Sequence, residues 1–301
     1  MNKYNISKEY GLLKYLSFPF NKTTIFLSKL VQSNNFLLLL NSKNISVEKT
    51  KIKTQDNKRI SIYIMKPRKI QTKKVMIYYH GGAFSFKGST RRHHLCKEYV
   101  LKGNCKLIFV DYRLMPKYKY PIPVNDCYDA YMWMINNYQK LNIDLNKIII
   151  AGDSAGGCLA ADVTLKLLEE NKILPSSQML IYPALDKRMK TESMKKYTDT
   201  PFWDSKNNQK MWNCYLENKE YLSPNEHTNF KNYPNTYIET AEFDCLHDEA
   251  IEFAEKLKKD NINVILNETK NTMHGFEIKY TSITKKCLND RLNFINNENI
   301  D

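Results

Sequence analysis

The feature that most constrains this chain is the hexapeptide at 152–157, which reads Gly-Asp-Ser-Ala-Gly-Gly. It follows the apolar run 147–151 and precedes a helical pattern that begins at Cys158. A Gly-x-Ser-x-Gly motif between a strand and a helix is typical of a nucleophile elbow, where the serine hydroxyl is exposed on a sharp turn. The same motif can also form an ordinary glycine-rich turn. The hypothesis that Ser154 is a nucleophile therefore depends on residues elsewhere in the chain.

A second glycine-containing segment lies upstream, at 80–84, and directly follows the apolar run 75–79. In lipases and esterases, a His-Gly-Gly loop after such a strand supplies backbone N–H groups to an oxyanion hole, together with the residue after the nucleophile. His80 itself is interpreted as structural, because a better candidate for the general base lies downstream. The predicted oxyanion hole is made of Gly81, Gly82, Ala83 and Ala155.

Downstream segments provide an acid and a histidine in the chain order of the α/β-hydrolase fold. Asp244 and His274 each follow a predicted strand, and ligands bind beyond the carboxyl ends of strands in open α/β sheets. We expect His274 to accept the proton of Ser154, and Asp244 to orient the imidazole and stabilise its charged form. Asp248 is a rival acid, but it lies inside the next helical pattern, where a carboxylate in the first turn is favourable.

These motifs resemble those of the hormone-sensitive lipase-like family of α/β-hydrolases, which includes bacterial carboxylesterases and arylacetamide deacetylase. The resemblance covers about residues 45–301 and extends beyond the elbow to four further segments: Asp-Tyr-Arg-Leu-Met-Pro at 111–116, the acid motif at 244–249, His-Gly-Phe at 274–276, and Met-Trp with Tyr-Leu within 211–216. It implies an α/β-hydrolase fold, with a mostly parallel central sheet flanked by helices and a helical cap.

The resemblance also implies roles inside the oxyanion loop. Gly82, Ala83 and Ala155 would donate their N–H groups, whereas Gly81 would permit the turn. Ala83 stands where the family has a third glycine, which places a methyl group near the acyl-binding space. Cys245 and His247 replace the proline and arginine that usually follow the acid.

The resemblance implies that residues 1–44 and an insertion at 185–232 form a cap over the catalytic domain at 45–301. The simpler alternative is that both are surface segments whose aromatic residues form small cores of their own. Trp203 and Trp212 fit that alternative as well as they fit substrate contact, because large aromatic side chains are usually buried.

The order of patterns along the chain indicates parallel βαβ units in one α/β domain. Two antiparallel edge strands are expected at 46–53 and 60–65. Helices are predicted at 90–102, 125–139, 157–170, 248–258 and 283–295.

The net charge of +14 suggests a nucleic-acid partner or an anionic membrane, but the lysines are spread along the whole chain. We therefore expect no nucleic-acid partner. The densest cluster falls at 187–196, in the proposed cap. His93 and His94 are interpreted as a solvated helix start rather than a metal site. Lysine and asparagine interrupt the apolar stretches of 1–44 and 185–232, which predicts no stable membrane insertion.

The remaining features concern location and chemistry. The N-terminus lacks the pattern of a secretory signal, and the seven cysteines are scattered singly, which favours reduced thiols in the cytoplasm. The leading hypothesis is a serine carboxylesterase that hydrolyses short- to medium-chain small-molecule esters through an acyl-enzyme, with no cofactor or metal. A deacetylase or amidase would use the same triad, and a non-catalytic receptor is the alternative of another class. A homodimer is compatible with the sequence.

Overall fold

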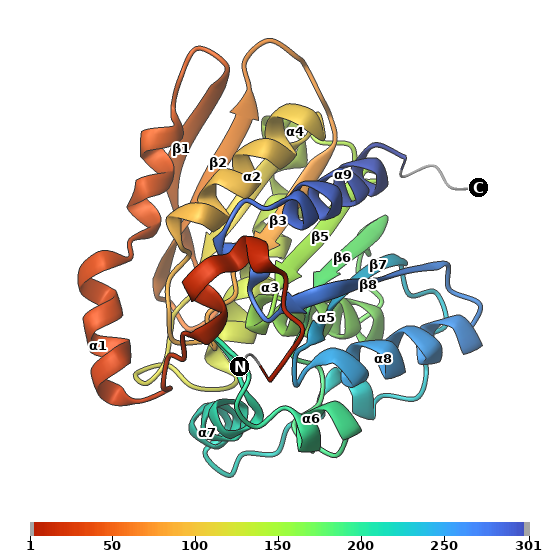
Figure 1. Ribbon diagram of the computed structural model, residues 1–301. Helices are drawn as coiled ribbons and strands as arrows, with labels where there is room; N and C mark the ends of the chain where they lie inside the picture. The colour runs from red at the N-terminus through yellow and green to blue at the C-terminus, as the bar shows by residue number, and fades with distance from the viewer. Residues whose placement is uncertain (1–2, 298–301) are drawn as a thin grey trace.

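The computed structural model describes residues 3–297, apart from the side chains of residues 29 and 30. Its centre is an eight-stranded sheet in the order β1-β2-β4-β3-β5-β6-β7-β8 (Figure 1). The six strands β3 to β8 run parallel to one another. Strand β2 pairs antiparallel with β4, and β1 pairs antiparallel with β2. The bounds are β1 Ile45–Lys53, β2 Arg59–Pro67, β3 Val75–Tyr79, β4 Lys106–Asp111, β5 Ile148–Asp153, β6 Ser177–Ile181, β7 Asn235–Phe243 and β8 Val264–Met273.

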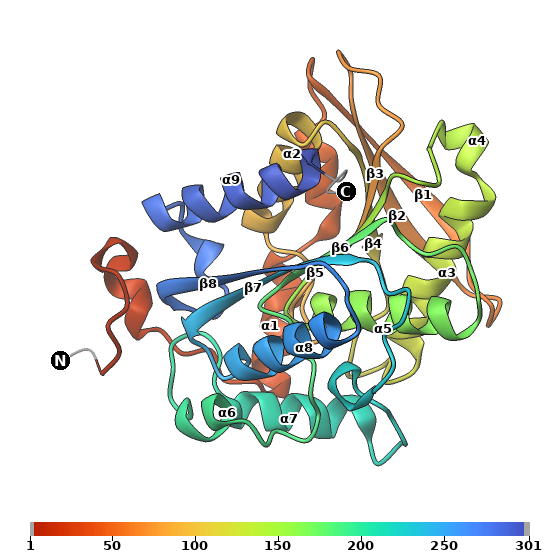
Figure 2. The ribbon, with the colours of Figure 1, turned by 90° about the vertical axis from the view of Figure 1, so that its right-hand side faces the viewer.

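Helices cover both faces of the sheet (Figure 2). One face carries α2 and α9, and the other carries α3, α5 and α8. The central strands β3, β5 and β6 are buried along their whole length, and β3 and most of β5 are continuous apolar runs rather than alternating patterns. The helix bounds are α2 Thr90–Lys102, α3 Ile122–Asn136, α4 Tyr138–Leu141, α5 Ala155–Glu169, α8 His247–Lys259 and α9 Ser282–Asn296.

The mostly parallel α/β sheet confirms the predicted fold class, and the expected bounds of α2 and β3 are those observed. Two details differ. The expected edge strand at 60–65 is the interior strand β2, which pairs with both β1 and β4 and is buried along most of its length. The helix expected at 125–139 begins earlier, at Ile122, and is broken near Asn137 into α3 and α4.

Two groups of short elements lie outside the layers. The first contains the 3-10 helix η1 Lys8–Tyr15, the helix α1 Lys22–Val31 and the 3-10 helix η2 Asn34–Leu40. The second contains α6 Glu192–Lys196, α7 Ser205–Leu216 and the 3-10 helix η3 Pro224–Glu226. The two groups contact each other: the N–H of Phe20 donates to Asn207 Oδ1 at 2.9 Å, and the rings of Phe18 and Phe202 lie 5.4 Å apart.

The basic cluster at 187–196 is largely paired within its own region. Lys187 forms an ion pair with Glu226, and Arg188 with Asp186. This pairing agrees with a general compositional bias rather than a free basic patch. Among the described helices, none combines the length and the apolar character needed to cross a membrane.

Candidate active site

Ser154 lies on the tight turn between β5 and α5. Its backbone angles, φ 54° and ψ −122°, are unfavourable for a residue with a side chain and are held by the surrounding structure. The Ser154 N–H donates to the Ile181 carbonyl at 2.9 Å. A Cβ at Gly152 would overlap the backbone of Gly156, and a Cβ at Gly156 would overlap the Tyr79 carbonyl. Both glycines are therefore required for the chain to turn at this point.

Three side chains that lie far apart in the sequence meet at this turn. His274 Nε2 lies 2.9 Å from Ser154 Oγ, and His274 Nδ1 lies 2.6 Å from Asp244 Oδ2. Asp244 follows β7, His274 follows β8, and all three side chains are buried. The second oxygen of Asp244 accepts the N–H of Leu246 at 3.0 Å, which fixes the carboxylate. The structure thus brings together the three residues that the sequence predicts as a triad.

The rival acid, Asp248, lies in the first turn of α8 and has other partners. Its carboxylate accepts the Ser193 N–H at 2.7 Å and lies 2.8 Å from His247 Nδ1. Burial would raise the pKa of Asp248, but these hydrogen bonds, with that of His247 the larger, lower it. Asp248 therefore anchors α6 to α8 and makes no hydrogen bond to His274.

The N–H groups of the predicted oxyanion loop fall into two classes. The Gly81 N–H donates to Asp153 Oδ1 at 2.9 Å, so this group is already occupied. Within residues 3–297, no atom accepts a hydrogen bond from the N–H of Gly82, Ala83 or Ala155. The loop is also conformationally restricted, because φ is 125° at Gly82 and 50° at Ala83. An oxyanion donor of this kind contributes roughly 3–4 kcal/mol to a transition state.

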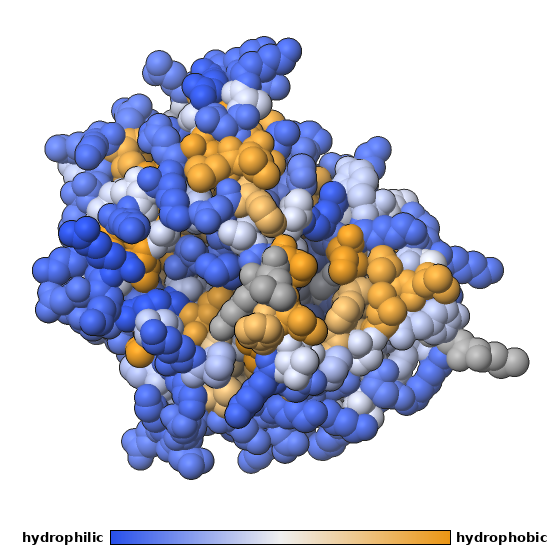
Figure 3. Space-filling model, turned by 90° about the vertical axis from the view of Figure 1, so that its left-hand side faces the viewer, coloured by the Kyte–Doolittle hydropathy of each residue, from blue (hydrophilic) through white to orange (hydrophobic). Residues whose placement is uncertain are grey.

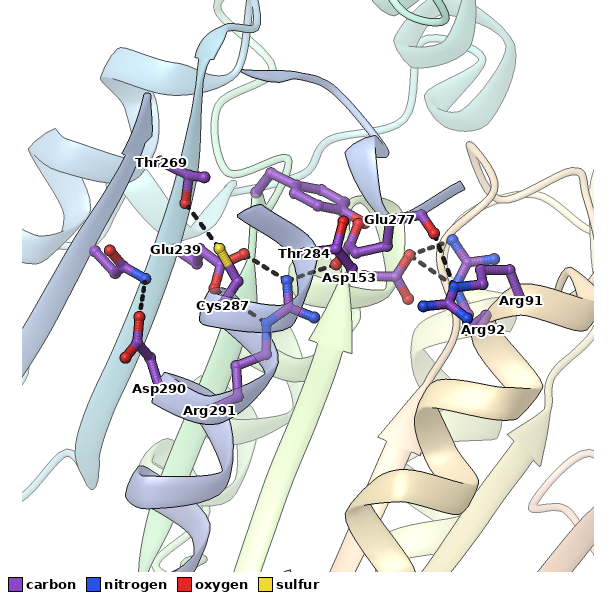
Figure 4. Close-up of polar contacts among 12 residues, drawn as sticks. Arg91, Arg92, Asp153, Glu239, Thr269, Glu277, Thr284, Cys287, Asp290 and Arg291 are labelled. Atoms are coloured by element: carbon purple, nitrogen blue, oxygen red, sulfur yellow. Dashed lines mark hydrogen bonds and ion pairs between the residues drawn. The ribbon is translucent and has the colours of Figure 1, made fainter. Parts of the chain in front are cut away.

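The carboxylate of Asp153, just before the nucleophile, connects the elbow to this loop, and its contact with Arg92 is shown in Figure 4. It accepts hydrogen bonds from Tyr78 Oη at 2.7 Å, from Gly81 N–H, and from Arg92 Nε at 2.8 Å. Burial alone would raise the pKa of Asp153, but the charge and hydrogen bonds of Arg92 hold it below the ordinary value. Sequence reasoning missed this pair, although Asp153 stands inside the motif.

Two histidines besides His274 are buried. The His80 ring stacks on Tyr112 and Phe109, with centroids 4.5 Å and 5.3 Å away, and burial lowers its pKa to about 4. His80 is therefore an uncharged side chain that packs against Phe109 of β4 and Tyr112. The expectation of a solvated start to α2 is wrong for His93, which faces Phe109 and has its pKa lowered to about 3 by burial. His94 is exposed.

A buried ionic cluster supports the loop that carries His274 (Figure 4). Arg291 of α9 donates to Glu239 of β7 at 3.0 Å and to Glu277, three residues after His274, at 2.5 Å. Tyr182 Oη also donates to Glu277, and the Tyr182 ring lies against the His274 imidazole at 4.8 Å. Since Glu277 belongs to the short 3-10 helix η4 Phe276–Ile278, the cluster holds the turn that follows the histidine.

Aromatic side chains from the outer elements reach the site. The Trp203 ring lies 6.2 Å from the His274 ring and 6.0 Å from Phe20. Tyr215 of α7 stacks on Phe84 at 3.8 Å, with the two ring planes 2° from parallel. Trp203 is thus adjacent to the imidazole, whereas Tyr215 contacts the residue that follows Ala83 in the oxyanion loop.

One further acid in this region lies in an apolar environment. Asp162 of α5 is buried and accepts a hydrogen bond from Tyr221 Oη at 2.9 Å. Burial raises the pKa of Asp162 to about 7. As for metals, the described residues contain no group of three or more His, Cys, Asp or Glu side chains that could hold an ion.

Comparisons with known proteins agree with this geometry. A family model described as the alpha/beta hydrolase fold matches residues 76–278. An arylesterase of Saccharolobus solfataricus is 30% identical over 235 residues, which cover 75% of each protein. The esterase LipI of Mycobacterium tuberculosis is 27% identical, and the match covers 67% of this chain and 65% of that protein.

Among solved structures, a bacterial heroin esterase superposes with a TM-score of 0.89 at 27% identity, covering 98% of both chains. The chain spans slightly less than two thirds of the length of some curated relatives, such as LipI. The family match, the fold and the named relatives confirm the resemblance drawn from the motifs. This chain belongs to the carboxylesterase group of the α/β-hydrolase family.

Proposed function

We propose that this protein is a serine carboxylesterase that hydrolyses short- to medium-chain esters through an acyl-enzyme. The observation that carries the proposal is the continuous hydrogen-bonded chain from Ser154 through His274 to Asp244. The nearby unpaired N–H groups and relatives named as arylesterase and heroin esterase support it further.

In the proposed reaction, Ser154 Oγ attacks the ester carbonyl while His274 Nε2 accepts its proton. The oxyanion that forms accepts hydrogen bonds from the N–H groups of Gly82, Ala83 and Ala155. His274 then protonates the departing alcohol, and a water molecule releases the acid by the same steps. Asp244 keeps Nδ1 protonated and stabilises the imidazolium. Every proton in this scheme is transferred by side chains of this chain, so it needs neither metal nor cofactor.

We infer that residues 1–44 and 185–232 together form the cap, over a catalytic domain of residues 45–301. The contacts between Phe18 and Phe202, and between Phe20 and Trp203, support one joint unit. The position of Trp203 beside His274 favours a role in substrate contact for this tryptophan. Trp212 packs among other aromatic rings, which agrees with a core role.

The proposal includes a reducing, cytoplasmic location and a small-molecule ester as the partner. The seven cysteines, all within the described residues, are present as thiols and six of them are buried, as expected where disulfides do not form. The homodimer of this proposal would form through β8, which lies at one end of the sheet.

The direct test is labelling with a fluorophosphonate probe, with the Ser154→Ala variant as the control. Labelling of the wild-type protein alone is expected, and a folded protein that reacts with neither probe nor ester would favour a non-catalytic receptor. A series of p-nitrophenyl esters of increasing acyl length then measures the substrate range. Faster hydrolysis of an aryl acetamide than of the matched acetate ester would favour the deacetylase alternative.

A further inference from the structure

We propose that the N-terminal elements form a reversible docking surface for an anionic lipid bilayer. Of the seventeen exposed large hydrophobic side chains that the structure describes, ten lie between residues 12 and 39, in η1, α1, η2 and the segments that join them. The most exposed are Leu12 at 82%, Leu39 at 79%, Val31 at 71% and Phe26 at 64%. We call these ten side chains the N-terminal apolar surface.

The helix α1 exposes apolar side chains as well as burying one. Ile25 is buried against the protein, whereas Phe26, Leu27 and Val31 are exposed to solvent. A surface helix of a globular protein normally directs polar residues outward, and a helix that is apolar all round is covered by something. The 3-10 helix η2 shows the same pattern, because Leu37 and Leu40 are buried while Leu38 and Leu39 are exposed.

Helix α1, which carries three of these side chains, lies on the left-hand face of the molecule in Figure 1. Figure 3 shows apolar surface across the middle of this face, with hydrophilic surface around it. Contiguous apolar patches on monomeric proteins are usually small, and larger ones mark contacts with proteins or membranes. The sequence expectation of no stable membrane insertion considered single stretches, which lysine and asparagine interrupt. It did not consider apolar residues that several short elements expose together.

The positive charge of residues 1–44 indicates what binds to the N-terminal apolar surface. Residues 1–44 contain a single acid, Glu9, and six lysines, of which Lys3 is paired with Asp199. Two copies of this chain that met symmetrically through this surface would bring the same positive charges together. An anionic bilayer has the opposite charge, and each lysine near such a surface strengthens binding roughly fivefold. Exposed Phe, Tyr and Leu beside Lys are also the composition of peripheral membrane helices.

The docking surface is connected to the active site by two ring contacts. On the inner side of the segment, Phe20 packs against Trp203, which in turn lies beside His274. A bilayer bound at the N-terminal apolar surface would therefore lie next to the cap, where apolar esters that partition into lipid reach the site by a short path. This last consequence rests on the proposed esterase function, whereas the docking itself does not.

The test compares two triple variants of the full chain. The variant Leu12→Ser/Phe26→Ser/Leu39→Ser removes three members of the N-terminal apolar surface. The matched control, Ile70→Ser/Tyr138→Ser/Ile173→Ser, removes three exposed apolar side chains elsewhere. Binding is measured by flotation with vesicles of phosphatidylcholine that contain about one third phosphatidylglycerol, and with vesicles of phosphatidylcholine alone.

The wild-type protein and the control should float with the anionic vesicles, more weakly in high salt, and little with the neutral ones. The first variant should bind at least about tenfold more weakly, as expected when three apolar side chains no longer enter the interface. Equal binding of both variants, or no binding by the wild type, would overturn the proposal. So would sedimentation showing a wild-type dimer that only the first variant abolishes, because a second copy would then be the occupant.

Hydrolysis of soluble p-nitrophenyl butyrate without vesicles separates this proposal from the proposed function. All three proteins should have the same rate, since the substituted side chains are exposed and lie outside the triad. Vesicle binding without any hydrolysis would leave the docking surface in place and count against the esterase.

Discussion

Arg92 Nε lies 2.8 Å from the carboxylate of Asp153, so a residue of α2 neutralises the side chain that directly precedes the nucleophile. The same carboxylate holds the Gly81 N–H. The elbow and the oxyanion loop are therefore fixed to each other through one buried acid.

Replacing Arg92 with glutamine should impair stability and catalysis together. Breaking a buried ion pair on one side leaves an uncompensated charge and costs about 3–5 kcal/mol. Because the Arg92 side chain is partly exposed, we expect the lower end of that range, measured by urea unfolding. The turnover number should also fall, because Arg92 would no longer hold the Asp153 carboxylate that accepts the Gly81 N–H. Lys97→Gln on the same helix is the control, and an equal loss there would show a general effect on α2.

Removing the nucleophile or the base should abolish hydrolysis without unfolding the protein. Triad residues act as a unit, so either Ser154→Ala or His274→Ala should lower the turnover number by about four to six orders of magnitude. Steady-state kinetics and thermal unfolding check the two halves of this prediction. Turnover close to that of the wild type in a folded Ser154→Ala protein would exclude the proposed mechanism.

The two candidate acids should differ strongly in their effects. Asp244→Asn presents the wrong tautomer of His274, which costs about ten-thousand-fold in a comparable triad. Asp248→Asn should have a much milder effect, because that carboxylate holds Ser193 and His247. The measurement is kcat for both variants with one soluble ester. If Asp248→Asn proved the more damaging, the acid would have been assigned wrongly.

Asp162 should make stability depend on pH. Its pKa is raised to about 7 by burial, so the folded protein binds a proton that the unfolded chain, with the ordinary pKa of 3.8, has lost. Stability should therefore decrease as pH rises from about 4 to 7. Asp162→Asn, which cannot ionise, should reduce this decrease. The check is the melting temperature of both proteins at several pH values between these limits, and parallel curves would contradict the prediction.

The catalytic triad could be predicted from sequence because each member has a local signature. Ser154 is marked by its glycines, and Asp244 and His274 by the strands before them. The cluster of Arg291, Glu239 and Glu277 has no such signature. Arg291 and Glu239 are 52 residues apart, and only the packing of α9 on the sheet brings them together.

His93 and the N-terminal apolar surface show a second limit of the sequence. The burial of His93 depends on which side of α2 faces the sheet, and the position next to exposed His94 gave no indication of it. Likewise, strand β4 was not predicted, although its apolar run 107–110 is buried at the centre of the sheet. Spacing along the chain describes neighbours in sequence, whereas these properties are set by neighbours in space.

The parallel stack of Tyr215 on Phe84 has a mechanical consequence. Because Phe84 adjoins Ala83, α7 can move away only if this stack breaks or the proposed oxyanion loop moves with it. The Tyr215–Phe84 stack thus joins the outer helix α7 to the proposed oxyanion loop. A displacement of α7 that separates these two rings would therefore remove a contact that holds the proposed oxyanion loop.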